Sequence, residues 1–271
     1  MKYYVKTQDG TRIFVEDINN KGKNIILFVH GWPLEHNMWE YQVERLIRRG
    51  HRCIAIDLRG YGKSDRPESG YYYDIMARDI MDVLNALNLR DVTLVGHSMG
   101  GAICIRYASK YKSERLSNLV LLGAAAPAWT KQGDWDYGYT KRQVDDLIKQ
   151  ANSERPKMIE NIRDQFFYKY VPPIVGQWFY DLCISAAGWA TVNSLMALRD
   201  ETLFDDLRNI SVPTLILHGT HDLVCPFEFA EYMNTMIPNS KLVPLTESGH
   251  APFYDQKDEV SDEINKFTKK I

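Results

Sequence analysis

A short motif near the middle of the chain contains a residue that could act as a nucleophile. Residues 96–100 read Gly-His-Ser-Met-Gly, which is the pattern G-x-S-x-G. A strand pattern over 92–95 leads into the motif and a helical pattern over 99–110 leads out of it. A serine on such a tight turn is held in a strained conformation, and glycine on either side removes side chains that would collide there. We therefore predict that the hydroxyl of Ser98 is a nucleophile at the carboxyl edge of a sheet.

A serine hydroxyl is a weak nucleophile until a base takes its proton, and the base needs a carboxylate that orients it. His250 comes just after the strand pattern at 241–245, and Asp222 follows the apolar run at 214–217. Both come after Ser98 in the order serine, acid, histidine, which is the order expected for a serine on a strand-to-helix turn. We predict that His250 is the general base and that Asp222 holds its imidazole in the correct tautomer.

Each of these three residues also has a purely structural interpretation. Ser98 could cap the helix that follows it, although a cap does not need glycine on both sides. Asp222 could accept local backbone hydrogen bonds in a turn, and His250 could belong to a surface loop. The competing acids follow no predicted strand, which favours Asp222. These competing acids are Asp200, Glu201 and Asp205.

Acyl transfer also needs N–H donors for the negative oxygen of the tetrahedral intermediate. For a serine on this kind of turn, one donor is the backbone N–H of the next residue, which is Met99. The other comes from the loop after the first core strand, which reads His-Gly-Trp-Pro over 30–33. Proline has no N–H, so we predict the Trp32 N–H as the second donor. The side chain of Trp32 could in addition line a substrate pocket.

The elements around these residues alternate between strands and helices. Strand patterns occur at 25–29, 53–56, 92–95, 119–122, 214–217 and 241–245, and a hairpin is predicted from 3–7 and 11–16. Helical patterns occur at 39–49, 74–87, 99–110 and 257–269. This alternation predicts an α/β fold in which helices flank a mostly parallel sheet of eight strands.

The alternation is interrupted after the sixth strand. The segment 124–203 has no clean buried strand and is rich in aromatic residues and amphipathic helical stretches. Bare loops of this length are uncommon in compact domains. We predict an α/β core formed by 1–123 and 204–271, with a helical cap inserted over 124–203. A few aromatic residues of the cap are expected to line a pocket, and the sequence does not indicate which ones.

Composition argues against several classes of partner. The formal net charge of -2 gives no field strong enough to favour nucleic acid or an anionic membrane. No apolar run is long enough for a transmembrane helix, and the first ten residues lack the pattern of a secretory signal. We therefore expect a small-molecule substrate and no nucleic acid or membrane partner.

The cysteines and metal-binding residue types are scattered. Cys53, Cys104, Cys183 and Cys225 form no C-x-x-C pair and mostly have apolar neighbours, so we interpret them as reduced thiols. Reduced thiols in turn predict a cytoplasmic location. The sequence contains no cluster that predicts a metal site, so we expect no metal.

The motifs, taken in order, resemble the α/β-hydrolase superfamily over nearly the whole chain. They are His-Gly-Trp-Pro-Leu at 30–34, Asp-Leu-Arg-Gly-Tyr-Gly-Lys-Ser-Asp at 57–65, the Ser98 motif, His-Gly-Thr-His-Asp at 218–222 and Gly-His at 249–250. Within the superfamily the chain is similar to the group of cofactor-free haloperoxidases and aryl esterases. By this resemblance the loop that carries Asp57 and Arg59 is structural, and no matching motif covers the cap.

The resemblance implies a hydrolase of small apolar or aryl carboxylic esters that forms an acyl-enzyme on Ser98 without a cofactor. Epoxide hydrolases and haloalkane dehalogenases carry an aspartate at that position, so the serine argues against both. Perhydrolase or haloperoxidase-like activity, lactone hydrolysis and carbon–carbon bond hydrolysis stay open on the same three residues. A non-catalytic ligand receptor is a further alternative, against which the complete set of three residues argues. The sequence does not indicate the oligomeric state.

Overall fold

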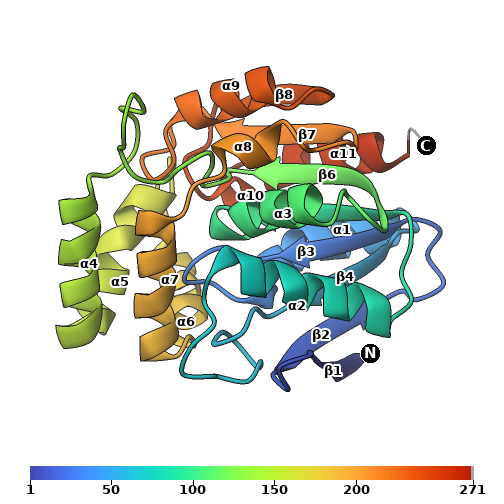
Figure 1. Ribbon diagram of the computed structural model, residues 1–271, viewed down its shortest axis with the longest axis horizontal. Coiled ribbons are helices and arrows are strands. Elements are labelled where there is room, and N and C mark those ends of the chain that lie inside the picture. Colours follow the sequence, from blue (N-terminus) through green and yellow to red (C-terminus); the bar gives the residue numbers. More distant parts are fainter. Residues whose placement is uncertain (270–271) are drawn as a thin grey trace.

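An eight-stranded sheet forms the centre of the fold in the computed structural model, which describes residues 1–269. The strands are β1 (Lys2–Lys6), β2 (Arg12–Ile18), β3 (Ile25–Val29), β4 (Arg52–Ile56), β5 (Val92–His97), β6 (Leu116–Leu122), β7 (Thr214–Gly219) and β8 (Ser240–Leu245). Their order across the sheet is β1-β2-β4-β3-β5-β6-β7-β8 (Figure 1). β2 pairs antiparallel with β1 and with β4, and all the other pairs are parallel.

The central strands are buried on both faces, which explains their continuous apolar sequences. Ile26, Leu27, Phe28 and Val29 of β3 all have 0% of their surface exposed. Burying one such side chain contributes roughly 1.5–3 kcal/mol. The sheet therefore forms a rigid base, and the loops at its carboxyl edge are held in place by strands that cannot easily move.

Helices cover both faces of this sheet. The helical elements outside the segment between β6 and β7 are η1 (His36–Trp39), α1 (Glu40–Arg48), α2 (Tyr73–Ala86), α3 (Met99–Lys110), α9 (Phe227–Met236), α10 (Pro252–Asp255) and α11 (Lys257–Thr268). α1 contacts α11 on one face, and α2 contacts α3 on the other (Figure 1). α9 packs against β7 and β8. Among the described residues no helix is long and apolar enough to cross a membrane.

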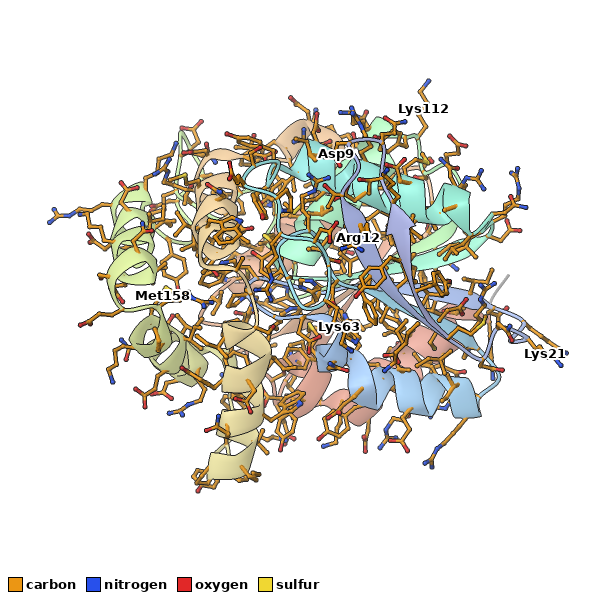
Figure 2. The ribbon with its side chains drawn as sticks, turned by 90° about the horizontal axis from the view of Figure 1, so that it is seen from below. Asp9, Arg12, Lys21, Lys63, Lys112 and Met158 are labelled. Carbon is orange, nitrogen blue, oxygen red and sulfur yellow. The ribbon has the colours of Figure 1, made fainter. Side chains whose placement is uncertain are left out.

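The segment between β6 and β7 is helical. It contains α4 (Lys141–Ser153), α5 (Arg155–Phe166), α6 (Pro173–Ile184), α7 (Gly188–Asp200) and α8 (Phe204–Leu207). α4 to α7 lie together beyond the carboxyl ends of the parallel strands (Figure 1). Figure 2 shows Met158 of α5 and Lys21, which precedes β3, at opposite ends of the molecule. The division into a core and a separate cap at residues 123/124 and 203/204 stays a prediction.

The predicted α/β-hydrolase fold class is confirmed, and most predicted elements match to within a few residues. The predicted helix over 39–49 is α1, from Glu40 to Arg48, and the 3₁₀ turn η1 precedes it. The sequence interpretation missed α9 completely. Its burial is limited to Phe229, Ala230 and Met233, so its apolar face is too short to give a clear helical period.

Candidate active site

Ser98 occupies the sharp turn between β5 and α3. Its backbone has φ 51° and ψ −119°, which is a conformation that a residue with a side chain rarely adopts. The two flanking glycines make this turn possible because their backbones are in tight contact with other chain segments. A Cβ on Gly96 would lie 2.5 Å from the Gly100 carbonyl oxygen, and a Cβ on Gly100 would lie 2.4 Å from the His30 carbonyl oxygen. The sharp turn that positions Ser98 therefore requires glycine at positions 96 and 100, because a side chain there would clash with the backbone.

The structure brings Ser98, His250 and Asp222 into one hydrogen-bonded chain. Ser98 Oγ lies 2.9 Å from His250 Nε2, and His250 Nδ1 lies 2.7 Å from Asp222 Oδ2. The side chains of His250 and Asp222 have 0% exposure, and Ser98 as a whole is 5% exposed. A charged carboxylate acceptor places the proton of the neutral imidazole on Nδ1, so Nε2 is free to accept the serine proton.

The second oxygen of Asp222 is held by the backbone of its own loop. Asp222 Oδ1 accepts hydrogen bonds from the N–H groups of Val224 and Cys225, both at 2.8 Å. His218 Nε2 lies 2.7 Å from the Cys225 carbonyl oxygen and donates to it, which ties this loop to the end of β7. Both carboxylate oxygens therefore have partners, and the group cannot rotate away from His250 without losing them.

Trp32 and Met99 lie on the two backbone segments that flank Ser98. Met99 is the first residue of α3, where an N–H group has no partner within the helix. Among the described residues neither the Trp32 nor the Met99 N–H donates to a backbone carbonyl. A Cβ on Gly31 would lie 2.9 Å from the Cβ of Ser98, so the absence of a side chain lets the Trp32 loop approach the serine closely. The Trp32 indole N–H donates to the Thr191 carbonyl oxygen in α7 at 3.0 Å.

Two neighbours of His250 were not predicted from the sequence. His97 Nε2 lies 2.8 Å from the His250 carbonyl oxygen and donates to it. Burial lowers the pKa of His97 well below its ordinary value, so its imidazole is neutral. The ring of Phe166, at the end of α5, lies 4.8 Å from the His250 ring, edge to face. The Phe166 carbonyl oxygen also accepts a hydrogen bond of 2.8 Å from the Ala251 N–H.

The loop with Asp57 and Arg59 does not reach the Ser98 chain. Arg59 forms two hydrogen bonds of 2.7 Å with the buried carboxylate of Asp79. Asp57 lies beside His36 and Glu35, and among the described residues these three bring atoms of the types that bind metals within 4.8 Å of one another. None of the three hydrogen-bonds to Ser98, His250 or Asp222, so a metal there would not belong to the candidate active site.

Comparison with known proteins shows to which family this chain belongs. Residues 24–155 match the family described as alpha/beta hydrolase fold, and residues 176–270 match the one described as TAP-like protein. The AB hydrolase superfamily protein YisY of Bacillus subtilis (strain 168) is 47% identical over 268 residues, which is 99% of both chains. The non-heme chloroperoxidase CPO-A1 of Kitasatospora aureofaciens is 33% identical over 252 residues, which is 90% of both chains. The structure of an esterase from Exiguobacterium antarcticum is 44% identical and superimposes with a TM-score of 0.97 over 99% of this chain and 100% of that one.

The mostly parallel sheet and the strained serine turn between β5 and α3 are features of the α/β-hydrolase fold. The chain belongs to the α/β-hydrolase family. The resemblance to haloperoxidases and esterases noted from the motifs is confirmed, because relatives of both kinds match nearly the whole length of the chain.

Proposed function

We propose that this protein hydrolyses carboxylic esters through an acyl-enzyme formed on Ser98. The observation that carries the proposal is the continuous chain from Ser98 Oγ to His250 Nε2 at 2.9 Å and from His250 Nδ1 to Asp222 Oδ2 at 2.7 Å. This geometry lets a base take the serine proton at the moment of attack. The similarity to an esterase over the whole chain supports the same conclusion.

The reaction runs in two balanced halves. Ser98 Oγ bonds to the ester carbonyl carbon while its proton passes to His250 Nε2, which gives a tetrahedral oxyanion. The intermediate collapses, the bond to the alcohol oxygen breaks, and His250 returns the proton to the leaving alcohol. In the second half His250 takes a proton from water, whose oxygen attacks the acyl-enzyme. Collapse then releases the carboxylic acid and restores Ser98.

Asp222 acts on this reaction through His250. Its negative charge stabilises the imidazolium that forms in each half-reaction, and its Oδ2 keeps the proton of the resting imidazole on Nδ1. The two backbone N–H groups at 2.8 Å hold the carboxylate in this orientation. A preorganised acceptor of this kind needs no rearrangement when the charge develops.

The Trp32 and Met99 N–H groups are proposed to hold the oxyanion. Support comes from their position on the two segments that touch Ser98, and from the lack of a backbone acceptor for either group among the described residues. Removing one such donor typically lowers kcat by about 10²–10³. Because both donors are backbone groups, their contribution does not depend on the rotamer of either side chain.

The substrate is proposed to be a small ester with an apolar or aryl portion. Ser98 is only 5% exposed, the buried ring of Phe166 packs against His250, and Trp32, on the segment that touches Ser98, is 5% exposed. A buried, aromatic surrounding favours apolar ester groups over charged ones, because a charge would lose its hydration there. The partner is thus a small molecule.

Perhydrolysis is the second candidate, since the chain is similar to a non-heme chloroperoxidase. The same acyl-enzyme would then be attacked by hydrogen peroxide in place of water, which releases a peracid. Lactone hydrolysis would use the first half-reaction with the leaving alcohol still attached to the acyl group. Peracid formation from acetate and hydrogen peroxide, and ring opening of a lactone, distinguish these activities from simple ester hydrolysis.

The experiment is to replace Ser98 by Ala and to measure turnover of p-nitrophenyl acetate and p-nitrophenyl butyrate. We expect kcat to fall by about 10⁴–10⁶ because the nucleophile is lost, while binding and the oxyanion donors remain. Ser109→Ala, a serine on the same helix α3 that lies outside the hydrogen-bonded chain, is the matched control and should keep wild-type turnover. Wild-type turnover in the Ser98 variant would refute the proposal. A wild-type protein without any turnover would favour a ligand receptor.

A further inference from the structure

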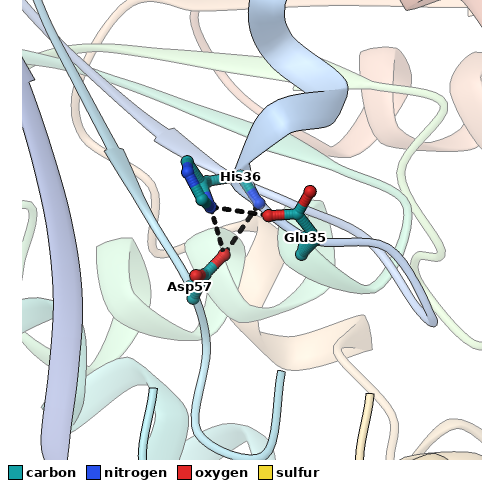
Figure 3. Close-up of side chains that lie close together, drawn as sticks. All are labelled: Glu35, His36 and Asp57. Carbon is teal, nitrogen blue, oxygen red and sulfur yellow. Dashed lines mark hydrogen bonds and ion pairs between the residues drawn. The ribbon is translucent and has the colours of Figure 1, made fainter. Parts of the chain in front are cut away.

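A second cluster of buried ionisable side chains lies away from the Ser98 chain. It consists of Glu35, His36 and Asp57, which come from the loops that follow β3 and β4 (Figure 3). His36 Nδ1 lies 2.6 Å from Glu35 Oε2 and 2.8 Å from Asp57 Oδ1. The His36 side chain is 1% exposed and that of Asp57 is 0% exposed. Two carboxylates thus face the same nitrogen of one imidazole.

These separations are those of hydrogen bonds and leave no room for an ion at Nδ1. Two ligand atoms on one zinc ion, each about 2.1 Å from it, lie about 3.4 Å apart at the tetrahedral angle. Glu35 Oε2 and Asp57 Oδ1 are both closer than this to His36 Nδ1. The Nδ1 side therefore holds a proton that is shared with the two carboxylates. The opposite ring nitrogen, Nε2, points away from them (Figure 3).

His36 Nε2 is buried, and among the described residues it has no hydrogen-bond partner. His36 also lines a cavity of about 250 Å³, together with Glu16, Asn37, Glu40 and Glu44. The nearest acidic atom is Glu16 Oε2 at 3.6 Å, which is too far for a hydrogen bond but close to the spacing of two ligands on one ion. The other oxygen, Glu16 Oε1, pairs with Lys2 at 3.0 Å, so Oε2 is the oxygen that remains open to a ligand.

The charge around His36 favours a cation on its ring. The buried carboxylates of Asp57 and Glu35 lie beside its Nδ1. The lining of the cavity adds the carboxylates of Glu16 and Glu40 and contains no lysine or arginine. Lys2 pairs with Glu16 Oε1, and the remaining carboxylates favour a cation on the cavity side of the ring.

We propose that His36 Nε2 and Glu16 Oε2 bind a divalent transition-metal ion of the Zn²⁺ type. An imidazole with carboxylates is a donor set that such ions accept, and the Glu40 carboxylate or water can complete the coordination. The contact of Nδ1 with Asp57 and Glu35 is the arrangement in which a metal-binding histidine donates its other N–H to a carboxylate. Binding releases the proton of Nε2 to solvent. The ion would connect β2 to η1, and this inference does not rest on the proposed function.

The test is isothermal titration calorimetry, in which tag-free, EDTA-treated full-length protein is titrated with ZnCl₂. We expect saturable binding of one ion per chain. Glu16→Gln should weaken binding at least ten-fold, and His36→Gln should abolish it. His221→Gln is the matched control, because His221 is exposed and lines a surface cavity together with Glu228 and Glu231. That variant should bind zinc like the wild type.

Several results would overturn the proposal. They are the absence of saturable binding, wild-type affinity in Glu16→Gln, and loss of binding in His221→Gln. The Glu16 side chain on β2 is 19% exposed, so we expect Glu16→Gln to fold. This variant therefore tests metal binding even if His36→Gln does not fold. Long-range ¹⁵N–¹H spectra of the imidazoles give an independent readout. Zinc should shift Nε2 of His36 and leave its Nδ1 protonated, and a metal on Nδ1 would contradict the assignment.

Discussion

Replacing Asp222 by Asn should disable the base while leaving the fold almost unchanged. In the wild-type protein Asp222 Oδ1 accepts from the Val224 and Cys225 N–H groups, and Oδ2 accepts from His250. Two backbone donors require an acceptor, so the asparagine carbonyl oxygen must take the Oδ1 position. The amide NH₂ group then faces His250 Nδ1 and donates to it. The proton of the neutral imidazole moves to Nε2, which can no longer accept the proton of Ser98.

The expected fall in kcat follows from this change of the histidine tautomer. Forcing the wrong tautomer on a histidine of this kind lowers kcat by about 10⁴, which corresponds to about 5.5 kcal/mol. The two backbone hydrogen bonds are kept, so the free energy of unfolding should change by only about 1 kcal/mol. Asp222→Ala removes the acceptor and leaves two buried N–H groups without a partner, at about 1–3 kcal/mol each. The two variants should therefore be similarly inactive but differ in stability.

The assay is kcat for p-nitrophenyl acetate, measured together with urea unfolding of the wild type and both variants. An Asn variant within ten-fold of the wild-type kcat would refute the assignment of Asp222. An Asn variant that is as unstable as the Ala variant would refute the argument that the backbone donors dictate the orientation of the amide.

Two further predictions concern stability. Gly100→Ala would place its Cβ 2.4 and 2.5 Å from two backbone carbonyl oxygens, so we expect a loss of at least about 3 kcal/mol or failure to fold. Gly188→Ala, with nothing within 4 Å of the new Cβ, should unfold at the wild-type urea concentration, and equal stability of the two variants would contradict the packing argument. Burial lowers the pKa of His30, His97 and His218 in the folded protein, whereas in the unfolded chain they take up a proton near pH 6.5. Their contribution is therefore present above pH 6.5 and lost below it, by up to about 1.4 kcal/mol per histidine and pH unit. Urea unfolding at pH 7.5 and 5.5 measures this loss, and equal stability at both values would be the contrary result.

The elements that position the site could be predicted from the sequence because burial leaves a strong local signal. β3 and β5 are nearly continuous apolar runs, and a strand followed by the Ser98 motif and a helical pattern defines the turn. Asp222 and His250 could be chosen because each follows a strand. All of these inferences use residues that are close together in the sequence. The catalytic roles of the three residues stay predictions, as does the cytoplasmic location.

Contacts between distant segments could not be predicted in the same way. Phe166 belongs to α5 but packs on His250, and nothing in the amphipathic pattern of α5 distinguishes it from a core residue. The hydrogen bond from His97 to the His250 carbonyl depends on how β5 meets a loop near the end of the chain. His36 lies outside every sequence motif, and only the fold brings Glu16 and Asp57 to its two nitrogens. The expectation of no metal was drawn from sequence spacing, which does not reveal such a cluster.

Ser98 is the residue that we propose becomes acylated. The most direct measurement is reaction of the folded wild-type protein with a serine-directed fluorophosphonate, followed by intact-mass analysis and peptide mapping. We predict one adduct per chain, located on Ser98, absent in Ser98→Ala and formed at least about 10³-fold more slowly in His250→Ala, since the serine then lacks its base. An adduct on another residue, or no adduct in folded protein that hydrolyses esters, would show that Ser98 is not the nucleophile.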